Sequence, residues 1–420
     1  MNKVLIVTYY WPPSGGAGVQ RWLKLSKYLP EFGWEPVILT VDPEYAAYPA
    51  LDKTLGKDLP ENIEVYRTRA SNWLRFYGAY KSKMPSAGFA NNRVTSWKDK
   101  IIRFLRGNFF IPDPRRGWNK FAFRKACDLI RKWNIITVIT TSPPHSTQLI
   151  GLSIKKKYPE IRWISDLRDP WTDIYYYHQF YPTFFSKKID TWYEKRVLRE
   201  ADKIITVGPS LKTTFSSKIK GITDKIEVIT NGYDESDFKG MTSTDPLRFT
   251  ITYVGTLSDQ YPIGGLLEAL TKLKKNDIDF LLRFAGKVPE TIMERIKSEI
   301  SKDSVEFIPY TRHENAITLM VNSSMLLLVI PEHPNNKSIV TGKIFEYIAS
   351  GKPILCLGPE KGDAAAILGR NNNGECYSYE DANNIETFIR SVMSNPGIWK
   401  IATDEFSHRN IAKKLVPFLG

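Results

Sequence analysis

Cysteine, histidine and long apolar runs are scarce in this chain of 420 residues. Its three cysteines, Cys127, Cys356 and Cys376, lie far apart, and no cluster of cysteine and histidine has the spacing of a metal site. The simplest inference is a reduced, cytosolic protein. No apolar run approaches the ~18 residues of a membrane-spanning helix. The apolar residues 3–10 are predicted to form a first strand rather than a signal peptide.

Basic and aromatic residues, by contrast, are abundant. The net charge of +14 favours anionic partners, which include nucleic acid, acidic lipid and phosphorylated ligands. The aromatic content of 13% is high for a plain enzyme, and aromatic rings mixed with Lys and Arg suit a membrane interface or single-stranded nucleic acid. Composition therefore narrows the partner to an anion without choosing among these classes.

Strand-like runs alternate with helix-like runs along the whole chain, which is typical of parallel α/β architecture. In the first half the expected strands are 3–10, 35–41, 63–68, 136–142, 162–167 and 202–208. In the second half they are 248–255, 279–286, 305–310, 324–330 and 353–358, with a further candidate at 375–379. We therefore expect two doubly wound, Rossmann-like domains of similar size.

The domain boundaries follow from changes in composition. Residues 1–211 are predicted to form the first domain, with an insertion of loops and helices at about 70–119 that is rich in basic and aromatic residues. A polar linker is expected at 212–246 and the second domain at 247–395. Residues 396–420 are predicted to be helical and to return to the first domain.

The segment 335–358 is predicted to form a loop, a short helix, a tight turn and a buried strand. Thr341 is the expected N-cap and Lys343 opens the helix, while Lys343, Glu346 and Tyr347 are expected to face away from the core. A helix start attracts phosphate, and a carboxylate one turn later can accept hydrogen bonds from a ribose. The segment therefore suits a nucleotide, with the alternative that Glu346 simply faces solvent on an amphipathic helix.

A glycine-rich loop, SGGAGVQR at 14–21, follows the first expected strand and opens a helix. Gly15 and Gly16 there allow backbone amides to approach a ligand closely. The loop is not GxGxxG, so a dinucleotide site is only weakly indicated. A turn that requires glycine for steric reasons remains the alternative interpretation.

Polar side chains follow two further strands. His145 lies in SPPHST, and Asp166, Arg168 and Asp169 lie in SDLRDPW, each at the carboxyl end of an expected strand. Ligands bind at such ends in open α/β sheets. His145 is more often structural in such a place. The three charged residues form either a buried ion network or a ligand site, and we favour the ligand because aromatic residues follow at 175–182.

Asp277 and Asp279 match a DxD metal signature. They precede an expected strand and so lie away from the ligand end of the sheet. We therefore interpret them as solvated turn residues.

A basic segment at about 97–132 carries eleven Lys and Arg residues against three Asp. Trp97, Ile101, Phe104 and Leu105 form an apolar helical stripe beside that charge. An amphipathic basic helix with aromatic anchors can lie in an anionic membrane surface. The alternative is a helix that packs on its own domain and leaves a solvated basic face.

As a set, these motifs resemble the retaining GT-B glycosyltransferases of family 4. The matching motifs follow one order: the glycine loop, TNGYD at 230–234, YVGTL at 253–257, FAGKV at 284–288 and GKIFEYIASGKPIL at 342–355. SPPHST and DLRDPW look like the branch that acts in bacterial surface-polysaccharide assembly. The resemblance implies two Rossmann-like domains facing a central cleft. The second would hold the nucleotide-sugar donor and the first the acceptor, with no obligatory metal and no cofactor.

The resemblance also assigns residues. Glu346 matches the glutamate that holds the donor ribose, Gly16 the glycine beside the diphosphate, and Asp169 lies where the family often carries a histidine near the transferred sugar. Two departures concern the donor site: Ser338 replaces a family glutamate, and residues such as Thr256 replace the basic residues that clamp the diphosphate. The expected catalytic residues are His145, Asp166, Arg168 and Asp169, and the expected donor-binding residues are Gly15, Gly16, Gly255, Thr256, Lys337, Ser338, Thr341, Lys343 and Glu346.

The expected function is transfer of a sugar from a UDP- or GDP-sugar to a lipid-linked or polysaccharide acceptor with retention of configuration. Alternatives of the same architecture are a nucleotide-sugar epimerase or hydrolase, and a non-catalytic sugar-nucleotide-binding protein. A nucleic-acid-binding function explains the charge but not the two-domain motif set, so we expect no nucleic-acid partner. Lipid-linked acceptors favour a peripheral location on the inner face of the cell membrane.

Overall fold

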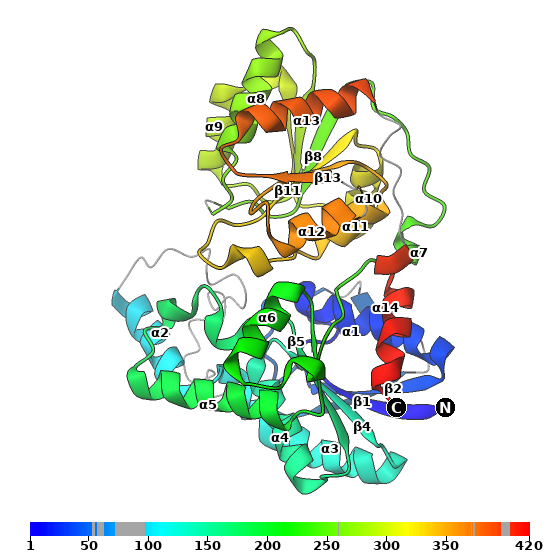
Figure 1. The fold of residues 1–420 in the computed structure, drawn as a ribbon. Coiled ribbons are helices and arrows are strands. Elements are labelled where there is room, and N and C mark those ends of the chain that lie inside the picture. The colour runs from blue at the N-terminus through cyan, green and yellow to red at the C-terminus, as the bar shows by residue number, and fades with distance from the viewer. Residues whose placement is uncertain are drawn as a thin grey trace. The chain divides into compact units, whose positions relative to one another are not determined.

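The computed structural model of the chain describes residues 1–52, 55–56, 63–71, 97–258, 260–370, 372, 374–395 and 404–420. Residues 1–231 and 408–420 form one unit, and residues 232–407 form the other. In each unit helices flank a parallel sheet (Figure 1). Two segments of the sequence-based prediction lie outside the described residues: residues 72–96 of the predicted insertion and residues 396–403 of the predicted C-terminal helical segment.

The first unit contains a seven-stranded parallel sheet among its described residues, in the order β3-β2-β1-β4-β5-β6-β7. Its strands are β1 (Asn2–Val7), β2 (Trp34–Val41), β3 (Glu64–Thr68), β4 (Thr137–Ser142), β5 (Arg162–Leu167), β6 (Lys203–Thr206) and β7 (Ile226–Val228). Its helices are α1 (Ala17–Tyr28), α2 (Trp97–Phe109), α3 (Asn119–Trp133), α4 (Gln148–Lys157), α5 (Phe184–Glu200), α6 (Pro209–Lys218) and α14 (His408–Leu415).

The second unit contains a six-stranded parallel sheet, again counted over the described residues, in the order β10-β9-β8-β11-β12-β13. Its strands are β8 (Thr250–Val254), β9 (Leu281–Ala285), β10 (Val305–Ile308), β11 (Met325–Val329), β12 (Ile354–Leu357) and β13 (Gly374–Tyr377). Its helices are α7 (Glu235–Phe238), α8 (Gly264–Lys275), α9 (Glu290–Glu299), α10 (His313–Val321), α11 (Lys343–Ala349), α12 (Asp363–Arg370) and α13 (Ala382–Ser394). The predicted pair of doubly wound domains is confirmed.

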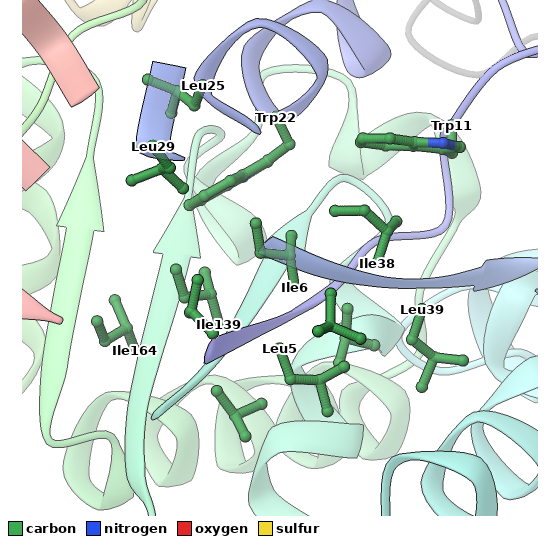
Figure 2. Close-up of a cluster of buried hydrophobic side chains, with 14 of the residues drawn as sticks. Leu5, Ile6, Trp11, Trp22, Leu25, Leu29, Ile38, Leu39, Ile139 and Ile164 are labelled. Carbon is green, nitrogen blue, oxygen red and sulfur yellow. The ribbon is translucent and has the colours of Figure 1, made fainter. Parts of the chain in front are cut away.

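The core of the first unit forms because its central strands are apolar on both faces, as expected for a parallel sheet covered by helices. Figure 2 shows Ile6 and Ile38 projecting from the same face as Trp22 of α1, with Leu5 and Leu39 on the opposite face. All five side chains are buried. Along a strand successive side chains alternate between faces, so one apolar run supplies the core on both sides of the sheet.

The strand order reverses beside the first strand of each sheet, and this reversal positions the candidate site. In the first unit Leu5 of β1 pairs with Val37 of β2 on one side and Val138 of β4 on the other. In the second unit Thr252 of β8 lies between β9 and β11 in the same way. Chains leaving such neighbouring strands diverge to opposite faces and open a crevice at the carboxyl ends. The candidate residues after β1, β4, β8 and β11 therefore lie at these two switch points.

The first unit extends beyond residue 211, where the sequence analysis begins the linker. Strand β7 pairs with β6, and residues 212–231 belong to the first unit. β7 has only three residues, which is too short for an apolar pattern to stand out. Helix α14 also belongs to the first unit, where it packs against α1 (Figure 1).

Candidate active site

The glycine loop of the first unit lies between β1 and α1 and leads into a twelve-residue helix. The backbone N–H of Gly15 donates to the carbonyl of Ala50 at 2.9 Å, and a Cβ at Gly15 would lie 3.2 Å from that of Asp52. Gly16 has φ 91°, which favours glycine, and caps α1 without a side-chain hydrogen bond. The N–H of Val19 donates to the carbonyl of Gly16 at 3.2 Å, and no side chain caps the helix start.

His145 begins the turn that follows β4 and lies half-buried against Trp171, with stacked rings 4.8 Å apart. Burial lowers the pKa of His145, and the nearby charge of Asp169 opposes that shift in part. Its Nδ1 is buried and has no hydrogen-bond partner among the described residues. The neutral imidazole therefore predominates at neutral pH, and it is a proton acceptor rather than a cation.

Asp113 fixes the turn that carries His145, and the sequence analysis missed it. Its carboxylate accepts hydrogen bonds from the backbone N–H and the hydroxyl of Ser146, at 2.7 and 2.9 Å. It also accepts from the backbone N–H of Arg115. Asp113 is buried and belongs to the end of the predicted insertion, so that part of the insertion packs directly beside the His145 turn.

Asp166 lies in a buried polar network, in contrast to its predicted contact with a ligand. Its side chain is 0% exposed. One carboxylate oxygen accepts hydrogen bonds from the indole of Trp22 and the hydroxyl of Thr141, each at 2.7 Å, and the other lies 3.3 Å from Nε of Arg21. The guanidinium of Arg21 in turn donates to the backbone carbonyl oxygens of Ile229 and Thr230. For Asp166 the structure therefore supports the ion-network alternative, because no surface of its carboxylate is left for a substrate.

Arg168 and Asp169 differ from Asp166 although they follow in the same motif. Arg168 is half-buried and donates to the carbonyl oxygens of Ser142 and Gly18, at 2.7 and 3.1 Å, so it ties the end of β4 to the start of α1. Burial lowers the pKa of Arg168, an effect opposed by Asp166 and Asp169. The half-buried carboxylate of Asp169 accepts no hydrogen bond from any described residue. Asp169 is thus partly accessible, whereas Asp166 is not.

In the second unit Lys343 is held at the end of β8. Its Nζ donates to the hydroxyl of Tyr253 at 3.1 Å and lies 4.3 Å from the centre of that ring. Burial lowers the pKa of Lys343 to about 8, and Glu346 opposes that shift. Gly255 has φ 128°, and a Cβ there would lie 2.7 Å from Nζ. A glycine at 255 therefore provides the space that the lysine head group occupies.

Two predictions about the helix of this segment are wrong. The N-cap of α11 is Gly342 rather than Thr341, whose hydroxyl is buried and has no partner among the described residues. Tyr347 is fully buried rather than solvent-facing, and its hydroxyl accepts a hydrogen bond from the backbone N–H of Val254 at 2.9 Å. Glu346 is half-buried in the first turn of α11. The tyrosine anchors α11 to β8 and so fixes the position of Lys343.

The remaining predicted donor residues lie on the loops after β8 and β11. Thr256 is exposed, and its carbonyl accepts the hydroxyl proton of Tyr253 at 2.8 Å. Lys337 is exposed in the turn 336–338, and Ser338 donates to the carbonyl of Asn335 at 3.3 Å. These contacts leave Lys337 accessible, whereas the short hydroxyl of Ser338 is directed to its own loop.

The DxD sequence forms a turn and an ion pair, in agreement with its interpretation from the sequence. Asp277 has φ 56°, and Asp279 accepts two hydrogen bonds from Arg248, at 2.7 and 2.6 Å. These hydrogen bonds lower the pKa of Asp279. Within the described part of the chain no group of three or more His, Cys, Asp or Glu side chains could hold a metal ion.

A separate surface of the first unit exposes apolar side chains on two contacting helices. Helix α2 exposes Trp97 (68%), Ile101, Phe104 and Phe109, and helix α5, which the sequence analysis missed, exposes Phe184 (73%), Phe185 (75%), Ile189 and Trp192. We name these eight residues the α2–α5 apolar surface. Asn108 joins the two helices, because its amide oxygen accepts hydrogen bonds from the backbone N–H of Thr183 and the hydroxyl of Ser186.

The charges of this surface are arranged asymmetrically. On α5 Lys187, Lys188 and Lys195 are exposed, whereas Asp190 and Glu194 are buried. On α2, however, Arg103 is buried and donates to Gln179, so it belongs neither to the membrane-facing basic helix that was favoured nor to the solvated basic face that was its alternative. None of the described helices is long and apolar enough to cross a membrane.

Comparison with known proteins adds two family matches. Residues 15–237 match the model of Glycosyltransferase Family 4, and residues 239–410 match that of Glycosyl transferases group 1. No curated protein sequence matches the chain.

Solved structures share the fold at low sequence identity. A glycosyltransferase from Rickettsia africae is 18% identical with a TM-score of 0.57, over 100% of this chain and 93% of that one. A sucrose-phosphate synthase from Thermosynechococcus elongatus is 13% identical with a TM-score of 0.58, over 100% and 95%. The lipopolysaccharide outer core galactosyltransferase WaaB in its apo form is 12% identical with a TM-score of 0.62, over 100% and 99%. With two Rossmann-like sheets in the GT-B arrangement of strands and a family model matched over more than half of its length, the chain belongs to Glycosyltransferase Family 4.

Proposed function

We propose that this glycosyltransferase moves a sugar from a UDP- or GDP-sugar to a lipid-linked or glycan acceptor, with retention of configuration and without a metal ion. The observation that carries the proposal is Lys343, a cation held at the switch point of the second sheet by Tyr253 and Gly255. A partly desolvated ammonium group interacts strongly with an anion, and the diphosphate of a nucleotide sugar is a dianion. In this proposal Lys343 and Lys337 neutralise the diphosphate in place of the missing clamp residues.

The other donor contacts follow from accessibility. The half-buried carboxylate of Glu346 accepts hydrogen bonds from the ribose, and the amides at the uncapped start of α1 stabilise the charge that develops on the leaving diphosphate. Gly15, Gly255 and Thr256 contribute backbone at close approach. Ser338 and Thr341 are not assigned a donor contact in this proposal. The hydroxyl of Ser338 donates to its own loop, and the hydroxyl of Thr341 is buried.

The acceptor side belongs to the first unit. The neutral imidazole of His145 and the carboxylate of Asp169 are the groups there that can accept a proton or stabilise positive charge on the reacting sugar. Arg168 ties the end of β4 to the start of α1, and Asp166 acts through the buried network rather than on the substrate. In a retaining transfer the acceptor hydroxyl attacks from the face that the diphosphate leaves, and a phosphate oxygen takes its proton.

Product analysis tests this proposal. The protein is incubated with each of a panel of UDP- and GDP-sugars and with lipid-linked and glycan acceptors, in the presence and absence of EDTA. We expect a new glycosidic bond with the anomeric configuration of the donor, read by NMR, and no loss of rate with EDTA. An isomerised nucleotide sugar would indicate an epimerase, free sugar a hydrolase, and no reaction with retained nucleotide binding a non-catalytic protein.

We also propose that the protein works at the cytoplasmic face of the cell membrane, held there by the α2–α5 apolar surface. Exposed aromatic rings beside lysines match the composition of helices that lie in an anionic membrane interface. Flotation with anionic vesicles tests this location. The double variant Phe184→Ser, Phe185→Ser should lose binding, whereas the control Leu247→Ser, Tyr310→Ser, which changes two exposed apolar residues of the second unit, should keep it.

A further inference from the structure

A basic pocket on the first unit has no role in the proposed transfer. It has a volume of about 340 Å³ and lies among α3, α4 and α5. Its lining residues come from these three helices and from the turn just before α3. None of them is among the predicted catalytic or donor-binding residues. A cavity of this size is within the range of small-molecule sites.

The charges of the pocket are all positive. Arg116, Lys120, Lys156 and Arg196 line it, and none of the lining residues is acidic. No described carboxylate forms an ion pair with any of the four. Four cations around one concave surface repel one another, so an anion that binds among them gains favourable interactions that the unoccupied pocket lacks.

Aromatic rings of α5 hold the two arginines at the rim. The guanidinium of Arg116 donates to the hydroxyl of Tyr193 at 3.2 Å and lies 5.5 Å from the centre of its ring. The guanidinium of Arg196 lies 5.2 Å from the ring centre of Trp192. A guanidinium oriented in this way loses little freedom when it forms paired hydrogen bonds to a phosphate.

The rest of the lining is apolar. Phe123, Leu149 and Leu152 contribute carbon surface beside the charged rim. A bare inorganic ion would leave that surface uncovered, whereas an amphipathic anion would contact both parts. The ligand that fits this lining carries a phosphate and an adjoining hydrocarbon portion.

The position of the pocket identifies the source of such a ligand. Tyr193 lines the pocket, and the next residue along α5, Trp192, is 53% exposed and belongs to the α2–α5 apolar surface. The two rings lie 5.1 Å apart. The pocket therefore adjoins the surface that is proposed to enter the membrane interface, where phospholipid phosphates lie at the same depth as tryptophan rings.

We propose that this pocket binds the phosphate headgroup of an anionic phospholipid, one molecule per chain. The proposal deepens the proposed membrane location, because it adds a specific headgroup site to a general attraction. It does not depend on sugar transfer, since no lining residue takes part in the transfer and binding is measured without a donor.

A short-chain phosphatidylglycerol, used below its critical micelle concentration, is the probe. Isothermal titration calorimetry should give saturable binding with a stoichiometry of one. Ser153 is exposed on the wall of the pocket, so Ser153→Trp fills the cavity without changing its charge. We expect the affinity of Ser153→Trp to fall at least about tenfold. The matched control is Ser217→Trp, another exposed helical serine of the first unit whose hydroxyl donates to a backbone carbonyl, and it should bind as the wild type does.

Removing charge gives an independent result. The double variant Lys120→Ser, Lys156→Ser should also reduce the affinity for the lipid at least about tenfold. Each lost lysine removes a favourable charge interaction with the lipid phosphate. The control Lys274→Ser with Lys275→Ser removes the same charge from α8 of the second unit and should have little effect. Melting temperatures near that of the wild type show that the variants are folded.

Three outcomes would overturn the proposal: absence of saturable binding, wild-type affinity in Ser153→Trp, and inorganic phosphate binding as tightly as the lipid. The last outcome would assign the pocket to a free anion. Vesicle flotation tests the proposed membrane location independently of the proposed headgroup site. If the wild type still floats with anionic vesicles after the pocket has failed these tests, the headgroup site is refuted while the membrane location stands.

Discussion

The two sheets reverse their strand order in the same way, yet their switch points are built from different chemistry. In the first unit, Asp166 and Arg21 form a buried charged network beside the half-exposed pair His145 and Asp169. In the second unit, one lysine lies on an aromatic ring, and a glycine makes room for its head group. The comparison shows that the same topology carries two kinds of polar group: a buried ion pair beside two half-buried titratable side chains in the first unit, and one cation on an aromatic ring in the second.

Breaking the buried network of the first unit should have the largest effect. Asp166→Asn removes the charge that Arg21 faces and weakens the hydrogen bonds from Trp22 and Thr141. Loss of one partner from a buried ion pair typically costs about 3–5 kcal/mol in the free energy of unfolding. Urea denaturation measures this loss. Asp128→Asn, which removes an exposed partner of Arg131, is the control and should cost less than about 1 kcal/mol.

Asp169→Asn should separate activity from stability in the same motif. Its carboxylate has no hydrogen bond to the described residues, so we expect a melting temperature near that of the wild type. The turnover rate should fall by about 10²-fold or more if the carboxylate acts on the reacting sugar or its proton. Steady-state kinetics with the preferred donor measure this. Unfolding of the variant, or an unchanged rate, would instead assign Asp169 to structure.

The second unit predicts a pH dependence of donor binding. The pKa of Lys343 is about 8 without ligand, so the ammonium form that attracts the diphosphate predominates below pH 8 and is lost as the pH rises above it. Donor affinity should therefore decrease above pH 8, while the diphosphate itself keeps its charge. Lys343→Met should lower the affinity about 10- to 100-fold and abolish this pH dependence, as measured by titration calorimetry.

Lys274→Met, an exposed lysine of α8, is the control for that experiment and should retain both the affinity and its pH profile. A pH profile in Lys343→Met that matches the wild type would show that another group titrates. The interpretation of Lys343 as the diphosphate cation would then be abandoned.

Glu346→Ala should have the smallest of these effects. Loss of one hydrogen bond between a ribose hydroxyl and a carboxylate costs about 1.5 kcal/mol at the lower end of the usual range, so the donor should bind about tenfold more weakly. Thermal stability should change little because Glu346 is half-buried rather than part of the core. Glu294→Ala, on exposed α9, provides the comparison. Equal dissociation constants for the wild type and Glu346→Ala would remove this residue from the donor site.

Much of the fold was predictable because apolar runs identify buried parallel strands. The run Ile354–Leu357, for example, is fully buried as β12, and its helix precedes it as expected. Strand β7 escaped prediction because three residues carry no pattern, and Tyr347 was misplaced because its hydroxyl finds a partner 93 residues away in β8. Helical periodicity indicates only on which face of its own helix a residue lies. It gives no information about a hydrogen-bond partner that is distant in the sequence.

The candidate site shows the same division between local and distant information. Gly16 and His145 were expected directly after strands, and the strand order puts both at the switch point of the first sheet, because strand ends can be read from the sequence. Sequence could not separate Asp166 from Asp169, since their difference lies in partners from β4 and α1. Asp113 was missed for the same reason: its hydrogen-bond partner Ser146 is 33 residues away.

The return of α14 to the first unit affects the order in which the two units can be completed during synthesis on the ribosome. The first unit contains residues 1–231 and 408–420, and the whole second unit lies between these segments in the chain. During synthesis α1 therefore has no α14 to pack against until residues 232–407 have been translated. The second unit is continuous in sequence and all of its residues precede α14, so it can complete its core before the first unit receives its last helix.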